Sequence, residues 1–156
     1  MNISIQRANL HDIDTIAPLF DAYRCFYQQT SDLKLAKSFL TERINRQESI
    51  LFLAQNDDQV GLGFVQLYPS FSSVSAQRLW ILNDLYVTQS ARRQGIAKRL
   101  MNCAKEFAIA DNAKGLFLET AHDNIEGQSL YESLGYRRNP EFYYFLDLRN
   151  QPHFPI

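Results

Sequence analysis

The most informative local pattern of this chain is NDLYVTQSARRQGIAKRLM, residues 83–101. Its apolar and β-branched residues predict a strand ending near Val87, and a polar turn then leads into a helix beginning near Ile96. The first amides of a helix lack intrahelical acceptors, and the helix dipole places partial positive charge beside them. Gly95 lets an anion approach the main chain here, and small Ala97 keeps the next position open. The turn therefore predicts a site for an anion such as a phosphate.

Positive side chains accompany this turn, because Arg92, Arg93, Lys98 and Arg99 lie within or beside it. A helix start with a solvated basic face would contain the same residues, and local physics alone does not separate the two interpretations. Two other kinds of phosphate loop fit the chain poorly. The glycines of GLGFVQL, residues 61–67, lack the third glycine of a dinucleotide fingerprint and continue as strand. The chain also contains no GxxxxGK[ST] loop.

Length and charge narrow the classes of function. A chain of 156 residues suits one domain. Its 16 Lys and Arg against 17 Asp and Glu give a formal net charge of -1, unlike the broad basic surface of a nucleic-acid binder. The start of the chain lacks a basic segment followed by an apolar run, and no window holds the roughly 18 apolar residues that a membrane span needs. We therefore expect a cytoplasmic protein that binds neither nucleic acid nor membrane.

We do not expect a metal site. His11, His122 and His153 are scattered along the chain, and no HExxH pattern is present. Cys25 and Cys103 lack the spacing of CxxC or Cys/His ligands, and each lies in a stretch with an amphipathic helical pattern. This context predicts two buried thiols.

The whole chain predicts an α+β (mixed α/β) fold in a single domain, residues 1–149, followed by a Pro-broken tail over residues 150–156. Asn9 and Ser31 are the expected caps of the first two helices, and Gly135 is the expected end of the last. The expected elements are, in chain order, a strand over 3–8, helices over about 10–27 and 32–46, strands over 49–55, 59–68 and 78–87 with a polar loop over 69–77, a helix over 96–112, a strand over 114–121, a helix over 125–134, and one or two strands over 135–148. This order, β-αα-βββ-α-β-α-β, gives a central twisted mixed sheet of about six to seven strands flanked by about four helices.

Two motifs together resemble those of the GNAT superfamily of acyl-CoA N-acyltransferases. The run RRQGIA, residues 92–97, resembles the signature (Gln/Arg)-x-x-Gly-x-(Gly/Ala) of that family. The run NIEGQSLYESLGY, residues 124–136, resembles its second signature, Asn-x-x-(small)-x-x-Leu-Tyr-x-x-x-Gly-(Phe/Tyr). The matching positions of the second run are Asn124, Gly127, Leu130, Tyr131, Gly135 and Tyr136. Both motifs lie in the order that the family uses, and the resemblance in element order covers nearly the whole chain.

The resemblance implies acetyl-CoA as the acetyl donor. Its pyrophosphate would rest on the amides from about Gln94 to Lys98, and its pantetheine arm would pair with the main chain of Leu85–Val87. Asn124 would hydrogen-bond the arm, and Tyr131 would act as the general acid that protonates the departing thiolate. The expected cofactor-binding residues are Leu85, Tyr86, Val87, Arg92, Arg93, Gln94, Gly95, Ile96, Ala97, Lys98, Asn124 and Tyr131. Two alternatives stay open, because Asn124 can simply cap the last helix and Tyr131 can simply pack on the sheet.

On the acceptor side, the resemblance implies a primary amine and a general base that takes its proton. In the family this base is often acidic and on the fourth strand, where Asp84 lies, and Glu119 on the next strand is the reserve candidate. By strand alternation Asp84 shares a face with Leu82 and Tyr86, unless the bulge that is common in the family intervenes. A solvent-facing Asp84 without a role is the alternative.

The expected substrate-binding residues are Tyr23, Tyr27, Tyr68 and Glu119, although aromatic residues at helical spacing are more often core. Aromatic rings and carboxylates favour a cationic acceptor, with polyamines or basic amino acids first among small and peptide-like amines. A non-catalytic module that senses acyl-CoA or binds a protein is the alternative function on the same fold. We expect a homodimer.

Overall fold

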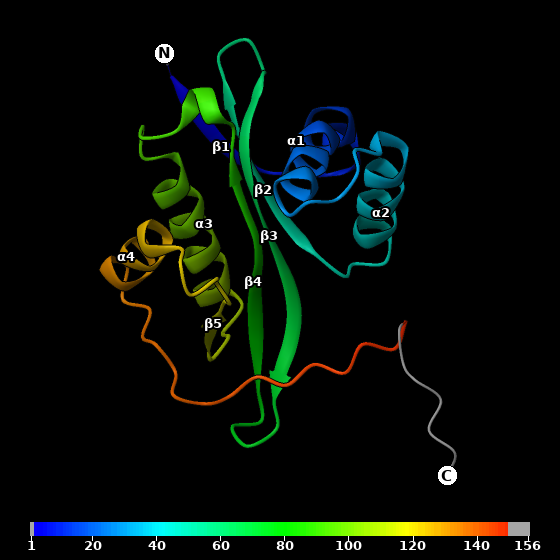
Figure 1. Ribbon diagram of the computed structural model, residues 1–156. Helices are drawn as coiled ribbons and strands as arrows, with labels where there is room; N and C mark the ends of the chain where they lie inside the picture. The colour runs from blue at the N-terminus through cyan, green and yellow to red at the C-terminus, as the bar shows by residue number, and fades with distance from the viewer. Residues whose placement is uncertain (1, 150–156) are drawn as a thin grey trace. The chain divides into compact units, whose positions relative to one another are not determined.

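The computed structural model describes residues 2–149 (Figure 1), so the tail expected over residues 150–156 lies outside the described range. The chain divides between Glu119 and Thr120 into two compact units. The first unit holds the sheet and helices α1 to α3, and the second holds helix α4.

The sheet of the first unit has five strands within the described residues, in the spatial order β1-β2-β3-β4-β5. β1 to β4 are antiparallel neighbours, whereas β5 runs parallel to β4. The strands are β1 (Ile3–Arg7), β2 (Ile50–Asn56), β3 (Gly61–Ser72), β4 (Gln77–Val87) and β5 (Gly115–Phe117). The predicted α+β class and mixed sheet are confirmed, with fewer strands than expected.

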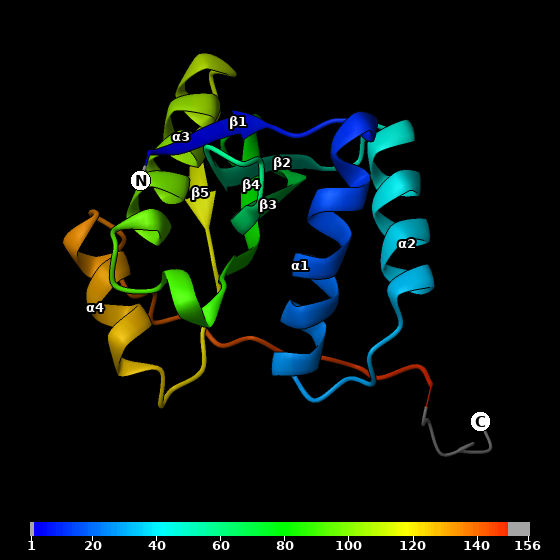
Figure 2. The same ribbon diagram turned by 90° about the horizontal axis from the view of Figure 1, so that it is seen from above.

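Helices cover both faces of this sheet. Helices α1 (Ile13–Phe26) and α2 (Leu33–Asn45) lie on one side, and α3 (Ile96–Ala110) lies on the other (Figure 2). Two short 3-10 helices, η1 (Leu10–Asp12) and η2 (Gln89–Ala91), precede α1 and α3.

The core on the α1 side forms where the apolar faces of α1 and α2 pack on apolar residues of β2 and β3. Ile16 and Phe20 of α1 and Leu40 of α2 are buried against Leu53 of β2 and Phe64 of β3. Burying an apolar side chain of this size contributes about 1.5–3 kcal/mol. This packing holds α1 against the strands that carry the candidate site.

Of the two residues expected to cap the first helices, Asn9 is confirmed and Ser31 is wrong. Asn9 caps η1 as predicted. Ser31 does not cap α2, because Asp32 accepts a hydrogen bond from the Leu35 amide at 3.0 Å. The Ser31 hydroxyl instead donates to the Asp21 carboxylate at 2.6 Å.

The expectation of two buried thiols is wrong for Cys25, which is exposed, whereas Cys103 is half-buried. The buried residues of α1 end at Phe20, so Cys25 lies on the last turn, beyond the part of the helix that faces the core.

Strand β3 runs further than the sequence predicts, because it includes Pro69–Ser72 in place of a polar loop. The β2 ladder ends with Ile50 opposite Leu67, and Pro69 lies beyond it, opposite Trp80 of β4. β3 is therefore an edge strand at Pro69, and a proline is tolerated there because no ladder needs its missing amide hydrogen.

The second unit contains α4 (Ile125–Ser133), which Asn124 caps by accepting a hydrogen bond from the Gly127 amide at 3.1 Å. Gly135 follows the helix with a φ of 94°, as expected of a C-terminal glycine. The strands expected over residues 135–148 are not formed in the described residues. Apolar alternation predicts a strand only where a partner strand completes the ladder. The large apolar side chains of this segment are exposed, namely Phe142, Tyr143, Tyr144, Phe145, Leu146 and Leu148.

Candidate active site

A β-bulge between β3 and β4 sets the direction of the Asp84 side chain. Gln66 pairs with Asp84, whereas the next residue of β3, Leu67, pairs with Leu82. Asn83 is therefore an extra residue in β4, without a ladder partner in β3. Because partners across a ladder share a face, Leu82 and Asp84 lie on opposite faces of the sheet.

Contacts identify the two faces. Trp80, two residues before Leu82, packs on Phe107 of α3 with ring centroids 5.0 Å apart. Tyr23 of α1 lies close enough to Asp84 for each to affect the pKa of the other. The bulge that the family resemblance allowed for is therefore present, so simple alternation does not hold at Asn83 and Asp84 faces α1.

Asp84 is the centre of a buried polar cluster. The residue is 1% exposed. It accepts hydrogen bonds from Gln66 Nε2 at 2.5 Å and from Asn83 Nδ2 at 2.7 Å. The Tyr23 hydroxyl donates to the Asn83 carbonyl oxygen at 3.3 Å. The alternative of a solvent-facing Asp84 is excluded by this burial.

Burial dominates the electrostatics of the cluster. It raises the pKa of Asp84, although hydrogen bonds from Asn83, Gln66 and Tyr23 act in the opposite direction. It also raises the pKa values of Tyr23 and Tyr68, and the nearby Asp84 charge raises both further. The two tyrosines thus keep their protons, while the carboxylate binds a proton more readily than an exposed aspartate does.

An aromatic row leads from the cluster toward solvent along α1. The Tyr23 ring lies 6.0 Å from Phe64 and 5.0 Å from Tyr27, and the Tyr27 ring lies 5.3 Å from Phe26, centroid to centroid. Tyr27 and Phe26 are 59% and 64% exposed. The predicted substrate residues therefore divide, because Tyr23 and Tyr68 border Asp84 whereas Tyr27 stands at the exposed end of the row.

Strands β4 and β5 pair over a short stretch only. The parallel ladder joins Leu79–Ile81 to Gly115–Phe117. In the described part of the chain, the later residues of β4 have β3 as their only strand partner. The strand expected to reach residue 121 ends at Phe117, so one edge of β4 is unpaired beyond Ile81.

This open edge presents main-chain groups of two of the three strand residues expected to bind the donor. The Thr88 amide donates to the Leu62 carbonyl at 2.8 Å. Backbone groups alternate along an antiparallel ladder, so those of Tyr86 also face β3, whereas those of Leu85 and Val87 face the open edge.

The turn between β4 and α3 has an unusual backbone. Arg93 and Gly95 have φ values of 63° and 76°, in the left-handed region. Gly95 occupies the cap position of α3, no side chain caps the helix there, and no acidic residue lies in its first turn. A Cβ atom on Gly95 would find no atom within 4 Å. The space beside the Gly95 Cα atom is therefore open, as close approach of an anion to the main chain requires.

The basic side chains at the turn differ in their partners. Arg92 Nε donates to the Val87 carbonyl at 3.0 Å, which joins the turn to the open edge of β4. Arg93 and Lys98 are exposed. Arg99 donates to the Ile3 carbonyl at 2.8 Å, so its charge is directed to β1 and not to the turn, contrary to expectation.

Comparison with known protein families matches residues 16–136 to the acetyltransferase (GNAT) family. The chain belongs to this family. It is 44% identical over 143 residues to the protein described as the uncharacterized N-acetyltransferase YhfO of Bacillus subtilis (strain 168), covering 92% of this chain and 95% of that protein. A probable acetyltransferase of Haemophilus influenzae is 34% identical over 135 residues, covering 86% of this chain and 90% of that protein.

The same family is found among solved structures. A crystal structure of a probable acetyltransferase superposes with a TM-score of 0.89 at 43% identity, covering 95% of this chain and 99% of that chain. The GNAT family and the activity class of an N-acetyltransferase, both expected from the sequence motifs, are thereby confirmed. GNAT acetyltransferases use acetyl-CoA as the acetyl donor.

The second GNAT motif lies in the unit that holds α4. Asn124 Oδ1 accepts from the Gly127 amide, and Asn124 Nδ2 donates to Thr120 Oγ1 at 2.9 Å. A Cβ on Gly127 would lie 2.3 Å from Asn124 Nδ2, which explains why this motif position is small. The Tyr131 ring lies 6.4 Å from that of Tyr136. The capping role of Asn124 is thus observed, and its role toward acetyl-CoA stays a prediction.

One predicted residue lies elsewhere than expected, and one residue of the cluster was not predicted. Glu119 was predicted to lie on a strand, and this is wrong, because β5 ends at Phe117 and Glu119 follows it as an exposed residue. Gln66, the donor to Asp84, was missed by sequence reasoning, although it is a single amide within the apolar run GFVQLY, residues 63–68. A lone polar residue in a buried strand signals a buried partner, but only the register of β3 and β4 identifies that partner.

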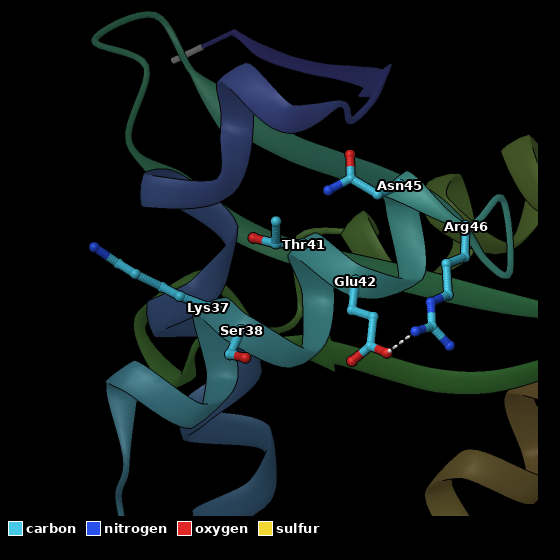
Figure 3. Close-up of a pocket in the computed structure, with 6 residues that line it drawn as sticks. All are labelled: Lys37, Ser38, Thr41, Glu42, Asn45 and Arg46. Atoms are coloured by element: carbon cyan, nitrogen blue, oxygen red, sulfur yellow. Dashed lines mark ion pairs between the residues drawn. The ribbon is translucent and has the colours of Figure 1, made fainter.

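The described residues bear on three other kinds of site, namely a metal site, a membrane span and a pocket elsewhere on the surface. No group of three or more His, Cys, Asp and Glu residues in that part of the chain is arranged to hold a metal ion. No described helix is long and apolar enough to cross a membrane. A hollow over the outer face of α2 is lined by polar side chains, including Lys37 and Thr41, and by the Glu42–Arg46 ion pair at 3.0 Å (Figure 3). It contains none of the residues of the Asp84 cluster.

Proposed function

We propose that this acetyltransferase moves the acetyl group of acetyl-CoA to a primary amine of a small, cationic acceptor, with polyamines and basic amino acids as the favoured class. The observation that carries the proposal is the buried Asp84 carboxylate at the β3–β4 bulge, bordered by the hydroxyl-bearing rings of Tyr23 and Tyr68.

Asp84 is proposed as the general base. An alkyl amine with a pKa near 10 is mostly protonated at neutral pH, and only its neutral form attacks a thioester. A carboxylate whose pKa is raised by burial takes this proton more readily than an exposed one. Since Asp84 is enclosed, we propose that the proton reaches it through water or through the Tyr23 hydroxyl, which donates to the carbonyl of the neighbouring Asn83 and also interacts with the Asp84 carboxylate.

The donor is proposed to bind along the open edge of β4 and the turn before α3. Leu85 and Val87 would pair their main-chain groups with the amides of the pantetheine arm. The amides from Gln94 to Lys98 would hold the pyrophosphate, with Arg92 and Arg93 beside it. The unobstructed space at Gly95 and the absence of a side-chain cap support this assignment.

Tyr131 is proposed as the general acid, on the basis of its position in the second GNAT motif. When the amine nitrogen bonds to the acetyl carbon, the carbon–sulfur bond breaks and the electron pair leaves with the sulfur. The Tyr131 hydroxyl would give its proton to that thiolate and regain one from the nitrogen, through water, as the amide forms, while Asp84 holds the proton that the ammonium group lost before attack. Asn124 would contribute a hydrogen bond to the pantetheine arm in addition to its observed role as a cap.

The preference for a cationic acceptor rests on the aromatic row of α1. Tyr23 and Tyr27 present ring faces that attract an ammonium group, and Asp84 supplies negative charge behind them. Tyr68 borders the same carboxylate from β3, and the exposed Glu119 is a further proposed substrate contact. A compact acceptor fits this arrangement, since no described helix or strand lies outside the sheet, its covering helices and α4.

A thiol-release assay tests the proposal. The full chain is supplied with acetyl-CoA and a panel of polyamines, basic amino acids, aminoglycosides and basic peptides, with matched alcohols and an amine-free reaction as controls. We expect thiol release that depends on an amine, with the acetylated amine identified by mass spectrometry. Turnover with alcohols alone would contradict amine transfer, and binding of acetyl-CoA without turnover on any acceptor would favour an acyl-CoA sensor.

We also propose a cytoplasmic homodimer. Sedimentation at several protein concentrations measures the oligomeric state directly, and a monomer at micromolar concentrations would contradict this assignment.

A further inference from the structure

A second cavity lies at the opposite end of α3 from the Gly95 turn. Its volume is about 570 Å³, within the range of roughly 300–1,000 Å³ that is typical of small-molecule sites. Its lining includes Arg7, Ser49, Arg78, Trp80, Phe107 and Asp111. We name it the Trp80 cavity.

The Trp80 cavity is separate from both parts of the proposed acetyl-transfer site. Phe107 and Asp111 lie at the carboxyl end of α3, a helix of 15 residues, so the length of α3, about 22 Å, separates this end from Gly95. Trp80 lies on the α3 face of the sheet, whereas the bulge turns Asp84 to the α1 face.

Two guanidinium groups border the cavity without an acidic partner. Arg7 Cζ lies 5.5 Å from the centroid of the Phe107 ring, and Arg78 Cζ lies 5.2 Å from that of Trp80. Neither side chain forms an ion pair or a hydrogen bond with the described residues. Contact with a ring face leaves the N–H groups of a guanidinium available, and their planar fork suits a carboxylate or a phosphate.

A buried hydroxyl adds an independent sign of a ligand. Ser49 is 8% exposed, lines the cavity, and its Oγ has no hydrogen-bond partner in the described structure. Buried polar atoms almost always have a partner, so such an atom at the wall of a cavity indicates a group that binds there.

The remaining walls indicate a planar apolar body. The Trp80 and Phe107 rings meet edge to face at an interplanar angle of 70°. Asp111 Oδ2 accepts from Trp80 Nε1 at 2.8 Å, so this carboxylate fixes the indole in place. Asp111 is the one acidic residue in the described lining, against two arginines.

We infer that the Trp80 cavity binds a small aromatic carboxylate, whose carboxylate accepts from Arg7 and Arg78 and whose ring packs against Trp80 and Phe107. The Ser49 hydroxyl completes the site by donating to the same carboxylate. This site does not depend on the proposed acetyl acceptor.

Trp80 makes the inference directly testable, because it is the only tryptophan of the chain. The full chain is titrated with benzoate while tryptophan fluorescence is followed, at constant ionic strength, with benzamide as the uncharged control. We expect a saturable change with benzoate and at least tenfold weaker binding of benzamide. A linear response to benzoate throughout the millimolar range would overturn the inference, and so would inorganic phosphate binding as tightly as benzoate.

Variants locate the binding. Arg78→Gln and Arg7→Gln should each weaken benzoate binding at least tenfold, while Arg46→Gln, on the outer face of α2 (Figure 3), should leave it unchanged. Arg78 contacts the Trp80 ring, so its replacement can change the fluorescence of the free protein. Arg7 contacts Phe107 instead, so Arg7→Gln tests binding without altering a direct contact of Trp80. Unchanged affinity in both variants of the cavity would contradict the assignment.

Discussion

The Asp84 cluster and the turn before α3 are both polar, but they are built in opposite ways. Asp84 is buried, and side chains from β3 and β4 provide its hydrogen bonds. The turn is exposed, its amides come from the main chain, and no side chain caps the helix that follows. The Asp84 carboxylate has its hydrogen-bond donors within the fold, whereas no side chain of the described residues occupies the amides at the start of α3.

The difference predicts which property each region controls. The proton transfer proposed for the enclosed carboxylate depends on the identity of one side chain. A turn made of amides binds through backbone shape, so it depends on conformation more than on side-chain identity. Changes at Asp84 should therefore alter rate, and changes at Gly95 should alter affinity.

The largest expected effect is that of Asp84→Asn. This variant removes the proposed base and retains the size of the side chain, so kcat/KM should fall by about 10²–10⁴-fold while the affinity for acetyl-CoA stays nearly unchanged. Steady-state kinetics and calorimetry measure the two quantities. Asp58→Asn, in the exposed turn after β2, is the control and should retain activity. Equal losses of rate and donor affinity would remove the distinction between the two regions.

The pH dependence of the native chain provides a second measure of Asp84. The base acts when it is ionised, and burial raises its pKa above the ordinary value of 3.8. Activity should therefore fall as pH decreases through this raised pKa, and the acidic limb should be absent from Asp84→Asn. The folded state holds the proton more tightly than the unfolded state, so the contribution of Asp84 to stability decreases as pH rises from 3.8 to the raised value.

A smaller effect is expected from Tyr131→Phe. Loss of the proposed general acid should lower kcat on the order of 10²-fold with donor affinity nearly intact. Tyr136→Phe is a close control, because it removes a hydroxyl from a neighbouring ring whose centroid lies 6.4 Å from that of Tyr131. Burial raises the pKa of Tyr136 to about 12, so this hydroxyl stays protonated and should be dispensable. Equal kcat in native chain and Tyr131→Phe would assign Tyr131 to packing.

The smallest of these effects is expected at Gly95. Gly95→Val places a branched side chain in the open space before α3, at a left-handed φ of 76°, and should weaken acetyl-CoA binding at least tenfold. Gly95→Asn separates backbone strain from obstruction by the side chain, because asparagine tolerates this φ but still adds a Cβ atom. Calorimetry gives the affinities and thermal unfolding reports the fold. Native affinity in the folded Val variant would show that the turn is only a helix start.

The same contrast explains what the sequence could predict. The turn at Gly95, the cap at Asn9 and the small residue at Gly127 depend on neighbours within a few positions, so local patterns identify them. The extension of β3 through Pro69 to Ser72 depends on its ladder with β4, because β2 begins only opposite Leu67, and no local pattern contains that information. The segment over residues 135–148 shows the converse, since its apolar residues predict strand while the described structure gives it no ladder partner.

The Asp84 cluster was predictable only in part. Asp84 was expected from the resemblance to the GNAT family, in which an acidic base is often on the fourth strand, and Tyr23 and Tyr68 were expected to line the acceptor pocket. Its burial and its hydrogen bond to Gln66 depend on the register between β3 and β4. This register brings together two residues that are 18 positions apart in the chain. Asp84 and Leu82 lie on opposite faces although they are two positions apart, because Asn83 between them is unpaired, and sequence periodicity does not reveal this extra residue.

Asn83 has the properties of a one-residue insertion into a complete sheet. Without it, Asp84 would directly follow Leu82 and the ladder opposite Gln66 and Leu67 would be regular, with every core residue on its present face. The sheet would lose nothing, but the Asn83 amide that donates to Asp84 and the carbonyl that receives the Tyr23 hydroxyl would be absent. A single extra codon thus supplies two polar contacts of the Asp84 cluster and leaves the rest of the sheet unchanged.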